Sequence, residues 1–157
     1  MKKLFLLMLC GLLLTSLCSC STQQKTGQQK TKKIEADEST FIVNFNNYCE
    51  DDIYGIHFEY YLDDVAQGGG VIENAGGTVL ATNDTLPKDF IPADFKASDN
   101  LNDFKIELFL KDKDGNEYSC ADSIKWDAVF GDTYTINITG GYSDGFTAEL
   151  SGTLLEK

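Results

Sequence analysis

Residues that carry catalytic chemistry are scarce in this sequence of 157 residues. It contains one histidine, His57, and no GxSxG segment, so a serine nucleophile with a histidine base is not indicated. Zinc-site spacings are absent as well, because the cysteines outside the first twenty residues are only two and lie far apart. The glycine runs at 68–70 and 76–77 flank strand-like segments and open no helix, which argues against a phosphate-binding loop. We therefore predict a non-enzymatic protein with no catalytic residues, no cofactor and no metal site.

Long apolar runs are also missing, except at the N-terminus. The chain opens MKKLFLLMLCGLLLTSLCSC, in which Lys2 and Lys3 precede an apolar segment that ends in small polar residues. This is the layout of a secretory signal. Residues 4–17 are too few to cross a hydrocarbon core as a helix, which takes roughly twenty residues. A permanent transmembrane helix is therefore the weaker interpretation.

The end of this segment, LCSC at residues 17–20, resembles the lipobox of bacterial lipoproteins. The resemblance implies cleavage between Ser19 and Cys20 and a diacylglycerol on the Cys20 thiol. Cys10 and Cys18 each follow a leucine where a small residue is expected, so both would leave with the signal. Ser21 fits the default pattern for an outer membrane in a cell that has one. The alternative is an ordinary secreted protein, without the lipid.

The next segment, residues 20–37, predicts a flexible linker, because it has one large aliphatic residue and no aromatic one. Its seventeen residues after Cys20 span about 20 to 25 Å. Residues 1–37 hold six lysines against two acidic residues, whereas residues 38–157 hold seven against twenty-three. The linker lysines suit anionic lipid or simply solvation. The acidic domain lacks the basic face that nucleic acid requires, so we expect no nucleic-acid partner.

Residues 38–157 have the size of one domain, and five segments alternate apolar and polar residues with period two. Each alternation predicts a strand that is buried on one face. The five segments are TFIVNFNN (40–47), YGIHFEYYLD (54–63), FKIELFLK (104–111), TYTINIT (133–139) and FTAEL (146–150).

Turn residues separate these strands, with Asp114-Gly115 predicting a hairpin within 111–118 and GGYSDG another at 140–145. Weaker strands are expected at 71–73, 78–81, 118–122 and 123–126. The proline-containing stretch 82–103 allows at most an edge strand, and one helical turn is the most that 98–102 supports. The fold class is therefore all-β, an antiparallel β-sandwich with an immunoglobulin-like topology, or else a small barrel.

Cys49 and Cys120 remain in the domain and, outside the cytoplasm, are candidates for a disulfide. Closing a loop of that length stabilises by about 4 kcal/mol. The alternative is that Cys120, which falls on the apolar side of its strand, is a buried free cysteine.

Three functions remain open for a lipid-anchored extracytoplasmic domain. The leading hypothesis is a binding or structural domain whose partner is a protein or glycan at the cell surface. A carbohydrate-binding module is the second, with Trp126, Tyr61 and Tyr142 as candidate stacking residues. A calcium-binding or metal-dependent module is the third, using the acidic loops 50–52 and 63–64 or the stretch 112–123. That stretch places Glu117 and Ser123 where an EF-hand needs glycine and glutamate, so a hairpin is favoured.

Overall fold

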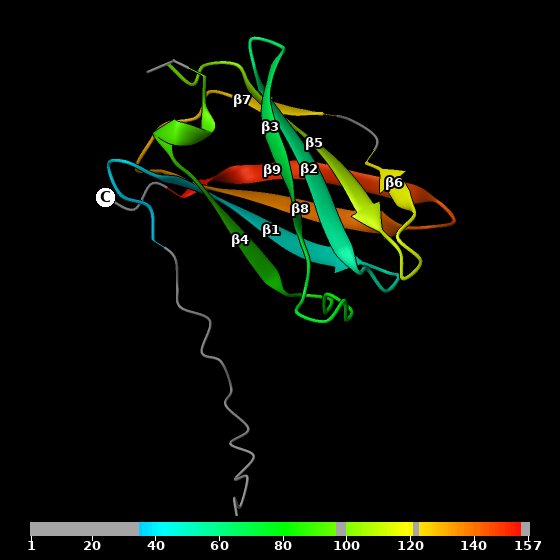
Figure 1. Cartoon of the computed structure of the whole chain (residues 1–157). Coiled ribbons are helices and arrows are strands. Elements are labelled where there is room, and N and C mark those ends of the chain that lie inside the picture. Colours follow the sequence, from blue (N-terminus) through cyan, green and yellow to red (C-terminus); the bar gives the residue numbers. More distant parts are fainter. Residues whose placement is uncertain (1–34, 97–99, 121–122, 155–157) are drawn as a thin grey trace, which may run out of the picture. The chain divides into compact units, whose positions relative to one another are not determined.

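The computed structural model describes residues 35–96, 100–120 and 123–154. The predicted signal peptide (1–19), the lipid site Cys20 and nearly all of the linker lie outside these residues. Within the described part, two sheets pack face to face as a sandwich (Figure 1). The first sheet has the order β4-β1-β8-β9, and the second has the order β3-β2-β5-β6 with β7 also paired to β5. The strands are β1 (Phe41–Cys49), β2 (Gly55–Leu62), β3 (Val65–Ile72), β4 (Thr85–Phe90), β5 (Phe104–Lys111), β6 (Glu117–Ser119), β7 (Ile124–Trp126), β8 (Thr133–Gly141) and β9 (Gly145–Leu154).

All five strands predicted from alternation are present, as β1, β2, β5, β8 and β9. In β5 the burial alternates without exception, with Phe104, Ile106, Leu108 and Leu110 buried and the residues between them partly exposed. Because side chains of a strand point alternately to the two faces, this pattern places one face of the sheet on the core. The two β6 and β7 segments confirm the weaker strands expected at 118–122 and 123–126.

Aromatic rings fill the centre of the sandwich. Phe41 of β1 stacks on Phe90 of β4 at 4.9 Å and meets Phe104 of β5 edge-on at 5.4 Å. Tyr60 of β2 lies 5.1 Å from the Phe90 ring. These contacts join both sheets, and each favourable ring pair adds about 0.5–1.5 kcal/mol beyond the area that it buries.

The strand order agrees with an immunoglobulin sandwich for five strands and then departs from it. Strands β1 to β5 take the sheet positions of B, C, C′, E and F in that fold. The place of strand A beside β1 is taken by β8, which runs parallel to β1. The predicted β-sandwich is confirmed, and its named strand pairs are antiparallel except for this one. Parallel neighbours need a long crossover, and the strands between β1 and β8 in the sequence provide it.

The edge strands β3 and β4 were the hardest to predict. The structure starts β3 at Val65 and runs it through the glycines 68–70, whereas 78–81 forms only an isolated bridge from Leu80 to Ile53. An added Cβ at position 68 would lie 2.5 Å from the Tyr60 hydroxyl, so a larger residue there would displace the Tyr60 ring. The stretch 82–103 contributes β4, an edge strand that contains Pro87, as expected, and a 3-10 turn at Pro92–Asp94.

The described chain enters the sandwich at one end and runs along β1 to the other. Residues 37–40 form a turn in which the Asp37 carboxylate accepts a hydrogen bond from the Ser39 backbone N–H at 2.9 Å. Strand β1 then begins, and its nine residues cover about 30 Å. The loop after Cys49 therefore lies at the end of the sandwich opposite the chain's entry (Figure 1). Among the described residues there is no helix of the length and apolarity that spanning a membrane requires.

Candidate functional site

Three loops at the end of the sandwich opposite the chain's entry enclose an open cleft of about 480 Å³. We call it the acidic cleft. It unites two acidic segments that are far apart in the sequence with one of the candidate stacking residues. Its lining residues are Glu50, Asp51, Asp52, Tyr54, Asp112, Lys113, Asp114 and Tyr142.

Hydrogen bonds fix the loops of the acidic cleft to one another. The Asp51 carboxylate accepts the backbone N–H of Tyr142 at 2.6 Å, and the Tyr142 hydroxyl donates to the Asp52 carbonyl at 3.0 Å. Gly141 leaves room for this contact, since a Cβ there would lie 2.5 Å from the Asp51 oxygen. Burial, and then the negative charges of Asp112 and Asp51, raise the pKa of Tyr142 to about 12. The cleft is therefore preformed and strongly negative.

The Asp112 carboxylate organises the hairpin between β5 and β6. It accepts backbone N–H groups from Asp114 and Asn116, both at 2.9 Å, and the Asn116 side-chain amide at 2.8 Å. Hydrogen bonds, foremost from the Asn116 side chain, lower the pKa of Asp112. The hairpin prediction for this stretch is confirmed by the pairing of Lys111 with Glu117. Across the described residues, no group of three or more His, Cys, Asp or Glu side chains is arranged to hold a metal ion.

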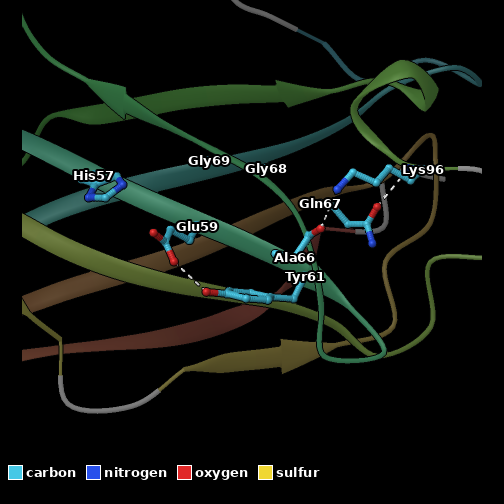
Figure 2. Close-up of a pocket in the computed structure, with 8 residues that line it drawn as sticks. All are labelled: His57, Glu59, Tyr61, Ala66, Gln67, Gly68, Gly69 and Lys96. Carbon is cyan, nitrogen blue, oxygen red and sulfur yellow. Dashed lines mark hydrogen bonds between the residues drawn. The ribbon is translucent and has the colours of Figure 1, made fainter.

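A second hollow, of about 320 Å³, lies on the outer face of the β3-β2-β5-β6 sheet, between β2 and β3 (Figure 2). Gly68 and Gly69 of β3 line it, together with the side chains of His57, Glu59 and Tyr61 of β2. The Tyr61 hydroxyl donates to the Glu59 carboxylate at 2.6 Å. This hydrogen bond, followed by burial, raises the pKa of Tyr61 to about 12.

Several polar groups around this hollow are held by contacts within the protein, whereas the His57 Nδ1 atom has no hydrogen-bond partner among the described residues. His57 lies outward, as expected, with its Nδ1 3.1 Å from a Glu117 carboxylate oxygen. Lys96 donates through its backbone N–H to the Gln67 side-chain oxygen at 2.9 Å. Lys105 lies over the Tyr61 ring at 4.2 Å from the centroid. The hollow therefore presents groups of both charges.

The three candidate stacking residues lie in three separate places. Trp126 packs edge-on against Phe104 at 4.7 Å and adjoins Tyr134 at 5.4 Å, at the margin of the core. Tyr61 lines the hollow between β2 and β3, whereas Tyr142 lines the acidic cleft. Among the ring contacts of the described residues, none joins two of these three. A single flat patch made from them is therefore not formed.

Cys49 and Cys120 are both buried free cysteines in the structure, so the disulfide stays a prediction. Burial raises the pKa of Cys49 to about 11, with a further contribution from the negative charge of Asp51. Burial likewise raises the pKa of Cys120 to about 12. Both thiols are therefore poor nucleophiles in the folded protein.

Tyr48 was not among the stacking residues predicted from the sequence. Its side chain is 42% exposed on the outer face of β1, which makes it the most accessible of the large aromatic side chains in the described part. The signal was present in the sequence, because Tyr48 continues the outward parity of Asn44 and Asn46.

No protein-family model and no curated protein matches this chain. A crystal structure described as that of "a putative cell adhesion protein from Bacteroides ovatus" is similar to it, with a TM-score of 0.37 and 16% sequence identity. The match covers 73% of this chain and 44% of that one, so the present chain spans less than half of its length. The function is therefore argued from the residues themselves.

Proposed function

We propose that this chain is a lipid-anchored, non-enzymatic binding domain on the extracytoplasmic side of a membrane, which is the outer membrane in a cell that has one. The anchor is a lipid on the Cys20 thiol. Each buried methylene of an acyl chain contributes about 0.8 kcal/mol, and two or three chains give durable attachment. The lysines before the cysteine, the short apolar segment and the lipobox-like residues 17–20 support this part of the proposal.

The observation that carries the binding role is the direction of β1. The chain enters the sandwich at the turn of residues 37–40, and β1 leads about 30 Å away to the acidic cleft. A tether that joins at this turn presents the far end of the sandwich, and the faces along β1, to whatever lies outside the cell. Residues 38–157 carry an excess of acidic side chains, which an anionic lipid surface repels. This repulsion favours the same orientation.

Hydrogen bonds hold polar side chains in place in both hollows, and this supports a binding role. In the acidic cleft, Tyr142 and Asp51 are engaged in hydrogen bonds to neighbouring loops, and in the second hollow Tyr61 is engaged by Glu59. Groups held by such bonds are preorganised, which suits a recognition surface.

Two cysteine variants test the anchor. Wild-type protein and Cys18→Ala should both remain in the membrane fraction after carbonate washing, whereas Cys20→Ala should appear in the soluble fraction. Cys18 is the matched control because it lies two residues away and differs only in its position within the lipobox-like segment. Membrane retention of Cys20→Ala equal to that of wild type would contradict the anchor.

A further inference from the structure

The outer face of the β4-β1-β8-β9 sheet is chemically unlike the rest of this acidic domain. Along β1 and β8 the inward residues are buried, and apart from Ile42 the outward ones are partly or fully exposed. From Asn44 and Thr135 to the far ends of these strands, the outward residues are all uncharged. We call them the neutral face: Asn44, Asn46, Tyr48, Thr135, Asn137 and Thr139.

Strand propensity explains only part of this composition. Threonine and tyrosine are favoured in strands, but asparagine is depleted, and three of the six residues are asparagines on central strands. Residues 38–157 carry twenty-three acidic side chains, yet in this sheet the outward acids Asp89 and Glu149 stand on the flanking strands β4 and β9. The centre of the face is free of charge.

The neutral face is ordered in rows that run across the strands. The register places Asn44 beside Thr135, Asn46 beside Asn137, and Tyr48 beside Thr139. The Asn46 amide donates to the Asn137 side-chain oxygen at 2.9 Å, and the hydroxyls of Thr139 and Thr147 are 2.8 Å apart. These bonds hold the side chains in fixed positions above the sheet.

Hydrogen-bonding capacity remains on this face. Of the described residues, none forms a hydrogen bond with the side-chain amide of Asn44 or with the side-chain Nδ2 group of Asn137. Tyr48 makes no ring contact within the described part of the chain, whereas Tyr142 stacks against Tyr118 at 4.7 Å. The face therefore combines an open aromatic ring with unused amide donors and acceptors.

We propose that the neutral face binds an uncharged polysaccharide, with Tyr48 stacking on a sugar ring and the amides of Asn44 and Asn137 bonding to sugar hydroxyls. Alternate residues of a strand lie about 6.7 Å apart, so the three rows extend about 13 Å along β1 and β8, with Glu149 of β9 beside Asn137. A strip of this length suits an extended chain. An acidic glycan is disfavoured by the acidic surroundings.

This inference rests on the proposed function, because the anchor and the direction of β1 turn the Tyr48 end of the face away from the membrane. A second copy of the chain is the rival occupant. It is less favoured because the face offers few apolar side chains to bury, and because two acidic domains repel each other.

The test uses the full chain in detergent and beads that carry dextran, laminarin, mannan or galactomannan, with alginate beads as the anionic comparison. The wild-type protein should be retained by at least one of the four neutral glycans and not by alginate. Retention should persist in 1 M NaCl, since a neutral ligand makes no ion pairs. Retention by none of the four neutral glycans, or equal retention on alginate, would overturn the proposal.

Two variants assign the binding to the neutral face. Tyr48→Ala should weaken retention about ten-fold or more, because a central aromatic contact is lost. The double variant Asn44→Asp with Asn137→Asp should do the same. It keeps the shape of both side chains and the acceptor for Asn46, but adds two charges. Wild-type retention in both variants would contradict the assignment.

The matched control is Asn102→Asp with Ser123→Asp, which adds the same two charges at exposed positions just before β5 and β7, strands of the other sheet. It should bind glycan like the wild type. Urea midpoints that agree among all variants establish that the fold is intact. A dimer by light scattering that the double Asp variant dissociates, without glycan binding, would reassign the face to self-association.

The two proposals fail separately. If Cys20→Ala stays in the membrane fraction but the protein is retained on a neutral glycan, the anchor is wrong and the neutral-face proposal stands. If Cys20→Ala leaves the membrane fraction but the protein binds none of the neutral glycans, only the neutral-face proposal is wrong.

Discussion

Replacing Asn47 with aspartate should destabilise the domain strongly and in a pH-dependent way. Asn47 is the polar side chain that the structure buries within its described residues, with 2% of its surface exposed. Its Nδ2 group donates to the carbonyls of Leu80 at 2.9 Å and Ala81 at 3.3 Å. Its Oδ1 accepts the Cys49 backbone N–H at 3.1 Å. The side chain thereby fastens the β3–β4 connection to the end of β1.

The substitution changes one nitrogen to oxygen and conserves volume, so its cost is electrostatic. The bond from the Cys49 N–H survives, but the two carbonyls of the β3–β4 connection lose their donor and face a carboxylate. An unsatisfied buried acceptor costs about 1–3 kcal/mol. A buried charge without compensation costs about 3–5 kcal/mol in total. Against a usual domain stability of about 5–15 kcal/mol, Asn47→Asp should fold at neutral pH with a much lower unfolding midpoint.

The pH dependence has a definite sign. Burial favours the neutral form of the introduced carboxyl group, so its pKa is raised in the folded state above the unfolded value of about 3.9. The folded variant then binds more protons than the unfolded chain, and the penalty grows as pH rises above about 4. Below that pH the carboxyl is protonated and can donate to the Leu80 carbonyl. The stability difference from wild type should therefore shrink between pH 7 and pH 4.

Urea unfolding followed by tryptophan fluorescence measures this difference. The protein has one tryptophan, Trp126, and it packs against Phe104 and Tyr134. The matched control is Asn46→Asp, one residue earlier on the exposed face, which should cost about 0.5–1.5 kcal/mol at neutral pH. Equal destabilisation by both variants at pH 7, or a gap that widens at pH 4, would refute the reasoning.

Three further outcomes follow from the structure. Gly68→Ala should lower the unfolding free energy by about 1–3 kcal/mol in urea denaturation, because its Cβ would meet the Tyr60 hydroxyl; an unchanged midpoint would speak against that contact. After reduction, the thiols of Cys49 and Cys120 in the Cys20→Ala chain should react slowly with iodoacetamide at pH 8, since burial raises each pKa to about 11 or above; rapid alkylation of native protein would contradict their burial. Thermal unfolding should be the same in excess calcium and in chelator, because the Asp112 carboxylate is engaged by hairpin donors; a raised midpoint in calcium would restore the calcium hypothesis.

Alternation in the sequence was sufficient to predict the interior strands. The segment FKIELFLK carries its burial pattern in its composition, since every second residue is large and apolar, and β5 follows it throughout. The fold class followed from these strands and from turn residues such as Asp114-Gly115. The edge strand β3 left no such signal, because it is exposed on both sides of its glycines.

The surfaces were harder to predict, because they depend on which strands become neighbours. The acidic cleft joins Asp51 to Tyr142, which are 91 positions apart. The neutral face depends on the parallel pairing of β1 with β8, and Asn46 and Asn137 are likewise 91 positions apart. The outward parity of Tyr48 was visible in the sequence, but its openness was not.

The separation of Trp126 from Tyr61 and Tyr142 has the same origin. All three residues lie in or beside strand-like segments, and strand parity alone does not fix which sheet or which end each ring belongs to. Trp126 is drawn to the margin of the core because β7 pairs with β5 at Phe104. Tyr61 lies on β2 of one sheet, and Tyr142 lies in the turn between β8 and β9 of the other.

The central claim is that a lipid on Cys20 holds this acidic β-sandwich outside the cell. Intact mass spectrometry of the full-length gene product, extracted from membranes, tests it most directly. The account predicts a chain that begins at Cys20 and is heavier than its amino-acid mass by a diacylglycerol, with or without a further acyl group. A chain that begins elsewhere, or that begins at Cys20 with its unmodified mass, would contradict the account.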